Sequence, residues 1–164
     1  MSSSTVVLAE TVRKEIDHWL AKYPEDQRRS AVIPALHIVQ AHYDGWLSPE
    51  LMNAVADYLQ IPRIAVYEVA TFYSLYELKP RGKHKIAVCT NISCMLCGSD
   101  KITQHLKKKL GISFGESTPD GKFYLKEVEC LAACGGAPVI QVNGQAYHEN
   151  LTPELVDKIL DELE

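Results

Sequence analysis

The hydrophobic positions in the first half of the chain have the spacing of helices. Apolar residues three or four positions apart, with charged residues between them, run through residues 12–23 and again through residues 28–43. This period puts the apolar side chains on one face and predicts two amphipathic helices. Pro34 lies in the second helix, which is therefore expected to start late or to kink. Ser48 followed by Pro49 predicts the start of a third helix, because serine caps helices and proline fits their first turn.

A fourth stretch, IAVYEVATFYSLY (64–76), is apolar or aromatic almost all the way round a helix. A helix with this pattern is buried on more than one side. A central place in a small helical bundle would account for the pattern, and so would docking of part of the helix against a partner protein.

After the basic linker KPRGKHK (79–85), the pattern changes to short apolar runs separated by turn residues. Asn143-Gly144 is a strong hairpin signal, and Ser99 and Thr152 are expected to cap two further helices, the first over about residues 100–110. The predicted strands cover residues 85–88, 123–129, 138–142 and 145–148. The resulting order β-α-β-β-α is that of a small thioredoxin-like layer.

The two patterns predict two domains of different architecture. Residues 1–80 are expected to form an N-terminal helical bundle, and residues 81–164 a thioredoxin-like α/β domain with a small mixed sheet. The fold class expected for the whole chain is therefore α+β.

Composition narrows the class of protein. Hydrophobic residues make up 46% of the 164 residues, enough for a core, and a formal net charge of −4 gives no general reason to expect nucleic acid as a partner. No apolar run approaches the roughly 18 residues that would span a bilayer, and MSSSTVVLAE lacks the basic start and long apolar stretch of a signal peptide. We therefore expect a cytoplasmic protein with no direct membrane insertion, in which thiols stay reduced.

All five cysteines lie in two short stretches, CTNISCMLCGSD (89–100) and CLAACGGAP (130–138). Each stretch follows a predicted strand, so both are expected to be loops presented by a rigid scaffold. In a reducing compartment, clustered cysteines indicate metal or redox chemistry rather than structural disulfides.

Four arrangements of these cysteines compete. The first stretch contains a C-x4-C pair, Cys89 and Cys94, and a further cysteine, Cys97; the second contains a C-x3-C pair, Cys130 and Cys134. In the first arrangement each pair holds one iron of a [2Fe–2S] cluster and Cys97 is spare. In the second, all three cysteines of the first stretch and Cys130 bind a [2Fe–2S] cluster, at the C-x4-C-x2-C…C spacing of plant-type ferredoxins. In the third, a single zinc ion is bound by Cys94 and Cys97 together with Cys130 and Cys134. In the fourth, Cys94 and Cys97 form a redox dithiol.

The spacing favours the first arrangement. The plant-type arrangement leaves Cys134 unexplained. The zinc site omits Cys89, although that residue directly follows a predicted strand. The dithiol accounts for only two of the cysteines. Small residues in the two stretches would let backbone N–H groups approach the sulfurs; they are Ser93, Gly98, Gly135 and Gly136. Met95 and Leu96 are expected to shield a cluster from water. On spacing alone, zinc and dithiol chemistry remain alternatives.

Other candidate groups add little. No histidine lies in either cysteine stretch, which argues against ligation of Rieske type. The sequence also contains no glycine-rich phosphate-binding motif, so we expect no nucleotide, flavin or substrate site on this chain.

Four segments, taken together, resemble the family of E subunits of bacterial NADH:quinone oxidoreductase, respiratory complex I. The segments are DGWLSPELMNAVADYLQIP, VATFYSLY, CTNISCMLCGSD and CLAACGGAPVIQVNG. The resemblance extends over about residues 27–150. Members of that family are thioredoxin-like [2Fe–2S] ferredoxins with a helical N-terminal extension. The resemblance implies that the ligands are Cys89, Cys94, Cys130 and Cys134, and that Cys97 stands where the family does not require cysteine.

The resemblance also implies a function. NADH delivers two electrons as a hydride and a [2Fe–2S] cluster takes one, so a flavin must stand between them. FMN and NADH would bind a partner, the flavoprotein F subunit of the same complex, and residues 64–76 would dock to it. The chain would then be an electron-transfer subunit of an oxidoreductase complex peripheral to the inner membrane. The equivalent subunit of an NAD-linked formate dehydrogenase or hydrogenase is one alternative, and a zinc-stabilised interaction module is another.

Overall fold

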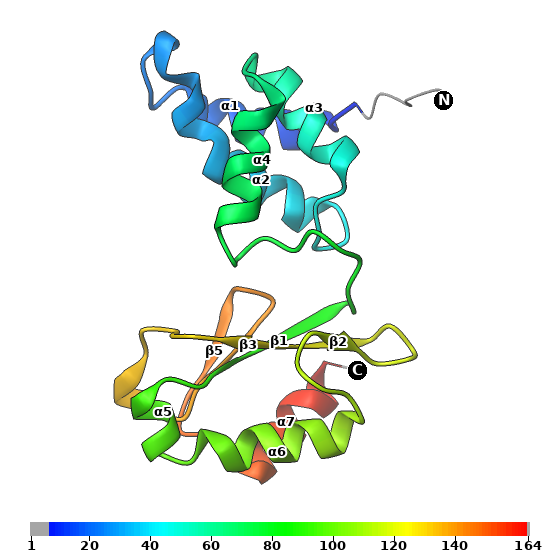
Figure 1. Ribbon diagram of the computed structural model, residues 1–164, viewed down its shortest axis with the longest axis vertical. Helices are drawn as coiled ribbons and strands as arrows, with labels where there is room; N and C mark the ends of the chain where they lie inside the picture. The colour runs from blue at the N-terminus through cyan, green and yellow to red at the C-terminus, as the bar shows by residue number, and fades with distance from the viewer. Residues whose placement is uncertain (1–6, 164) are drawn as a thin grey trace. The chain divides into compact units, whose positions relative to one another are not determined.

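The computed structural model describes residues 7–163. The chain divides into two compact units, Met1–Pro80 and Arg81–Glu164, which run from blue to green and from green to red in Figure 1. Each unit has its own hydrophobic core. None of the helices within residues 7–163 is both long and apolar enough to cross a bilayer. The expectation about a signal peptide rests partly on residues 1–6, which lie outside the described residues.

Helices form the first unit and bury the faces that their spacing predicts. They are α1 (Glu10–Leu20), the 3₁₀ helix η1 (Glu25–Ala31), α2 (Val32–His42), α3 (Pro49–Leu59) and α4 (Arg63–Phe72). Ile16 and Leu36 are fully buried in the core between them. Pro34 lies in the first turn of α2, where a missing N–H breaks no helical hydrogen bond. Ser48 caps α3 as predicted, because its Oγ accepts the N–H of Leu51 at 3.2 Å.

The helix α4 ends at Phe72, four residues before the end of the predicted stretch. Beyond it, the side chain of Gln40 supplies the hydrogen bonds. Its Nε2 donates to the carbonyl of Leu75 at 3.2 Å, and its Oε1 accepts the N–H of Glu77 at 2.7 Å. The hydroxyl of the buried Tyr76 donates to a backbone carbonyl of α2 at 2.9 Å. Tertiary hydrogen bonds therefore override the local helical pattern here.

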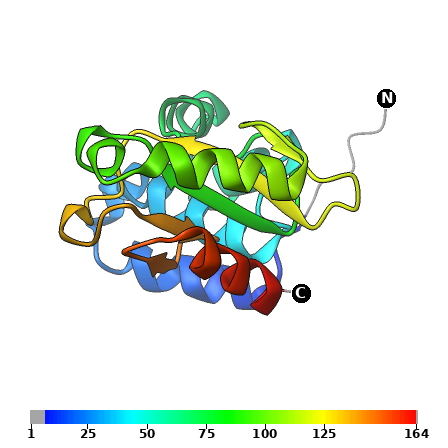
Figure 2. The ribbon, with the colours of Figure 1, turned by 90° about the horizontal axis from the view of Figure 1, so that it is seen from below.

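The second unit is built on a mixed sheet. Within the described residues its strand order is β2-β3-β1-β4-β5, with β1 (His84–Cys89), β2 (Glu116–Ser117), β3 (Phe123–Val128), β4 (Ile140–Val142) and β5 (Ala146–His148). β1 runs parallel to β3 and antiparallel to β4. The helices α6 (Ser99–Leu110) and α7 (Pro153–Glu162) lie on the same face of the sheet (Figures 1 and 2). The predicted α+β class is confirmed.

One predicted turn is confirmed and one predicted cap is wrong. Asn143 and Gly144 adopt φ angles of 52° and 74°, which suit the tight hairpin between β4 and β5. Ser99 does not cap α6. Gly98, with φ of 95°, occupies the N-cap position and Ser99 is the first helical residue. Glycine reaches this left-handed conformation without steric cost, so it can start the helix one residue earlier.

Candidate metal centre

The parallel pairing of β1 and β3 brings the two cysteine stretches to one edge of the sheet. Cys89 lies opposite Val128, so the first stretch begins where β3 ends, two residues before Cys130. The N–H of Cys89 also donates, at 3.2 Å, to the carbonyl of Val139, the residue that directly follows the second stretch. Because the carboxyl ends of parallel strands meet at the same edge, the two motifs become neighbours.

The cysteine stretches are not simple loops, contrary to expectation. The first contains the short helix α5 (Ile92–Leu96) and the second contains the 3₁₀ helix η2 (Cys134–Gly136). Figures 1 and 2 show both at the same end of the second unit. Asn91 caps α5, since its Oδ1 accepts the N–H of the next residue at 2.8 Å. An asparagine in this position is a recognised start signal, so the sequence did contain a clue to α5.

The helix α5 separates the cysteines of the first stretch by burial. Cys94 lies within it and is buried together with Cys89, where both pack against Val139. Cys97, at the C-cap of α5, is exposed. Both cysteines of the second stretch, Cys130 and Cys134, are also exposed. The C-x4-C pair is therefore an inner pair of donors and the C-x3-C pair an outer one.

The thiols of the two pairs interact with one another. Burial alone would raise the pKa of Cys89, but hydrogen bonds from the backbone of both stretches and from Cys94 and Cys130 outweigh it and lower that pKa. Burial raises the pKa of Cys94 to about 11, together with its hydrogen bond to Cys89 and the negative charges of Cys89 and Cys134. Loss of the protons from all four thiols would place like charges beside one another, and bound metal ions would compensate that charge.

The donor set fits a [2Fe–2S] cluster. All donors are thiols, the ligands of iron–sulfur clusters. The inner and outer pairs also interact with each other, since Cys130 contributes to the pKa of Cys89 and Cys134 to that of Cys94. A Cβ added to Gly98 or Gly135 would meet no atom within 4 Å, so these two glycines of the cysteine stretches face open space. The N–H of Ala132 donates to Sγ of Cys130 at 3.2 Å, a hydrogen bond that stabilises a thiolate ligand.

The outer face of α5 carries exposed apolar side chains. Met95 and Leu96 are 47% and 78% exposed, and their expected role in shielding a cluster from water stays a prediction. Ile92 is 66% exposed and lies three and four positions before them, on the same side of the helix. We call these three residues the α5 face. Apolar side chains gathered on a surface mark contact sites for other molecules, so the α5 face is a candidate contact surface beside the cysteines.

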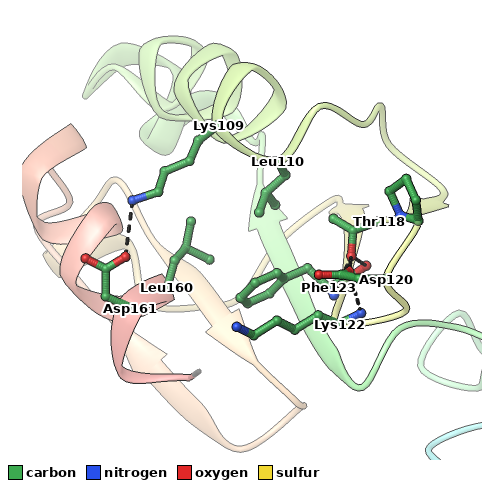
Figure 3. A pocket seen from close by; sticks show the side chains of 9 residues that line it. Lys109, Leu110, Thr118, Asp120, Lys122, Phe123, Leu160 and Asp161 are labelled. Atoms are coloured by element: carbon green, nitrogen blue, oxygen red, sulfur yellow. Dashed lines mark hydrogen bonds and ion pairs between the residues drawn. The ribbon is translucent and has the colours of Figure 1, made fainter.

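A pocket lies at the end of the sheet opposite to the cysteines, and its lysine is paired with carboxylates. It lies beside Phe123, where β3 begins, whereas the cysteines follow the ends of β1 and β3. Figure 3 shows Lys109 reaching across it to Asp161, and its Nζ lies 3.4 Å from that carboxylate and 3.0 Å from that of Asp157. The lysine charge is therefore already paired, and the pocket gives no reason to expect an anionic substrate.

This fold and these paired thiols define a class, the thioredoxin-like iron–sulfur proteins of electron transport. The sequence profile of the family described as "Thioredoxin-like [2Fe-2S] ferredoxin" matches residues 16–164. The chain belongs to this family, whose members carry a [2Fe–2S] cluster, and the predicted family resemblance is confirmed.

Named relatives agree with this assignment. The chain is 48% identical over 144 residues to the E subunit of NADH-quinone oxidoreductase from Rickettsia bellii (strain RML369-C), covering 88% of this chain and 86% of the relative. It is also 48% identical over 151 residues to an E subunit of the same enzyme, numbered 2, from Rhizobium meliloti (strain 1021), covering 92% and 88%. Both relatives are subunits of an oxidoreductase complex.

A solved structure shares the fold. The crystal structure of the air-oxidised NAD⁺-reducing [NiFe]-hydrogenase matches with a TM-score of 0.70 over 86% of this chain, at 19% sequence identity. This chain spans about a quarter (24%) of the matched hydrogenase chain. At this identity the match supports the fold of the chain and not its activity.

Proposed function

We propose that this chain exchanges single electrons with FMN on a partner flavoprotein, the F subunit, during NADH oxidation by NADH:quinone oxidoreductase. The observation that supports this most strongly is the meeting of the C-x4-C and C-x3-C pairs at one sheet edge, in a chain of this ferredoxin family. A [2Fe–2S] cluster supplies one-electron redox chemistry when bound, and the chain makes and breaks no substrate bond.

The proposed ligands are Cys89 and Cys94 for one iron and Cys130 and Cys134 for the other. The mutual interactions of these thiols support the set. Cys97 is left out because it is not among the thiols that affect the pKa of Cys89 or of Cys94. The backbone N–H groups near the sulfurs would stabilise the negative charge that the site gains on reduction.

The residues of the chain have three tasks in this proposal. The inner pair, Cys89 and Cys94, anchors the site in the core around Val139. The outer pair lies at the surface, where an electron can reach it from a partner. The α5 face beside it would contact the flavoprotein and exclude water from the path.

The helical unit, residues 1–80, is proposed as a second docking region for the same flavoprotein. α4 and the segment after it expose Ile64 (65%), Phe72 (79%), Tyr73 and Leu75. This is the apolar stretch whose pattern left docking open, and its uncovered side chains favour that interpretation. Assembled in this way, the chain would be a cytoplasmic component of a complex peripheral to the inner membrane.

Electron exchange with the flavoprotein can be measured directly. The chain, reduced with dithionite and freed of excess reductant, is mixed anaerobically with FMN-loaded flavoprotein. We expect the chain to reoxidise while FMN is reduced, with two chains consumed for each FMN because the cluster carries one electron and FMN accepts two. The control is the same flavoprotein without FMN. Equal reoxidation in both mixtures, or none in either, would contradict the proposal.

A further inference from the structure

The loop between β5 and α7 is attached to the second cysteine stretch by backbone hydrogen bonds. The N–H of Asn150 donates to the carbonyl of Gly136 at 2.6 Å, and the N–H of Leu151 donates to the carbonyl of Pro138 at 3.2 Å. Gly136 is the last residue of η2, the turn that begins with a cysteine. The backbone therefore fixes where the preceding residue, Glu149, lies relative to that turn.

The side chain of Glu149 covers Gly136. A Cβ built on Gly136 would collide with the Cβ, Cδ and Oε2 atoms of Glu149, with Cδ only 2.5 Å away. Gly135, by contrast, has open space on its side of the turn. A carboxylate thus lies against the turn that carries Cys134, one of the proposed iron ligands.

In the described part of the chain, the carboxylate of Glu149 has no ion-pair partner. Among the ion pairs of residues 7–163, none involves Glu149. The side chain is exposed, so water and salt reduce its field but do not remove it over a short distance.

A nearby negative charge has a definite effect on a one-electron centre. Reduction adds one negative charge to the cluster, and a fixed carboxylate repels that charge more than it repels the oxidised state. The carboxylate therefore favours the oxidised form and lowers the reduction potential.

We propose that Glu149 sets the reduction potential of the cluster, because the β5–α7 loop holds its carboxylate over the turn that carries Cys134. This inference rests on the proposed ligand set and adds a residue outside it. Glu149 is a positioning residue that acts through its charge, without touching iron.

The test compares Glu149→Gln, which removes the charge at nearly constant shape, with Glu149→Asp, which keeps it. The matched control is Glu162→Gln, the same change at an exposed residue near the C-terminal end of α7, away from the cysteines. The reduced fraction of cluster-loaded protein is followed by electron paramagnetic resonance in a redox titration, at low and at high salt.

At the midpoint potential of the unchanged protein, Glu149→Gln should raise the ratio of reduced to oxidised cluster three- to tenfold, where tenfold corresponds to 59 mV for one electron. Glu149→Asp and Glu162→Gln should leave the ratio near one, and high salt should shrink the effect of Glu149→Gln.

An unchanged ratio in Glu149→Gln would overturn the inference, as would an equal shift in Glu162→Gln. A shift in Glu149→Asp as large as that in Glu149→Gln would show that packing and not charge is responsible, and would overturn it too. If Glu149→Gln does not retain a cluster, Glu149→Ala, which also removes the charge, is titrated in its place with the same expected rise in the reduced fraction. Absence of a [2Fe–2S] signal from the unchanged protein would instead contradict the ligand proposal itself.

Discussion

At the scale of single residues, the account depends on which thiols bind iron. We predict that Cys97→Ser keeps the cluster, because Cys97 is not among the thiols that affect the pKa of Cys89 or of Cys94. Serine at any of the four proposed ligand positions should abolish or visibly alter the cluster, since an alkoxide oxygen is a poor substitute for a soft thiolate. The measurement is the visible absorption spectrum of the anaerobically purified variants. Loss of the cluster in Cys97→Ser alone would refute the ligand set.

A second residue-scale prediction concerns Tyr76 and pH. Burial raises the pKa of Tyr76 to about 12, with a smaller contribution from Tyr73. The folded state holds this proton more tightly than the unfolded state, so the stabilisation is complete below pH 10 and is lost as the pH rises from 10 towards 12. The free energy of unfolding in urea should therefore fall more steeply between pH 10 and pH 12 in the unchanged protein than in Tyr76→Phe. Parallel curves would contradict the role of Tyr76, because other tyrosines, such as Tyr58, are common to both proteins.

At the scale of elements, the sequence predicts features that depend on neighbouring residues, but not those that depend on residues far apart in the chain. The cap at Ser48 and the turn at Asn143-Gly144 depend on residues next to each other, and both were predictable. The segment that follows α4 is held by hydrogen bonds to Gln40, more than thirty residues earlier, so the local sequence pattern does not predict where α4 ends. The helix α6 starts one residue earlier than predicted. Gly98 adopts a left-handed conformation and takes the N-cap position that the sequence assigned to Ser99.

The α5 face supplies the element-scale prediction. Leu96→Asp places a charge in the proposed contact surface and should weaken binding to the flavoprotein by at least about tenfold, or ~1.4 kcal/mol. The reduction potential of the cluster should change little, because the ligands and their hydrogen bonds are untouched. The measurement is the dissociation constant of the complex, determined alongside the potential.

The control for Leu96→Asp is Tyr147→Asp, a change at an aromatic side chain of β5 that is 49% exposed and lies outside both proposed docking regions. Equal binding by all three proteins would remove the α5 face from the proposed interface. Equal weakening by both variants would indicate a general effect of added charge.

At the scale of the whole molecule, the site exists only because of strand pairing. The sequence placed both cysteine stretches after strands, but it did not show that β1 and β3 lie side by side and parallel. That pairing brings Cys89 to the end of β3 and makes the two motifs neighbours. Spacing alone therefore leaves zinc and dithiol chemistry open, and the family resemblance favours the [2Fe–2S] arrangement.

The metal content of the intact chain tests the central claim most directly. Iron, acid-labile sulfide and zinc are measured in anaerobically purified protein, together with the visible spectrum before and after dithionite. We predict two irons and two sulfides per chain and a brown protein that dithionite bleaches. A colourless protein with one zinc ion per chain would contradict the account.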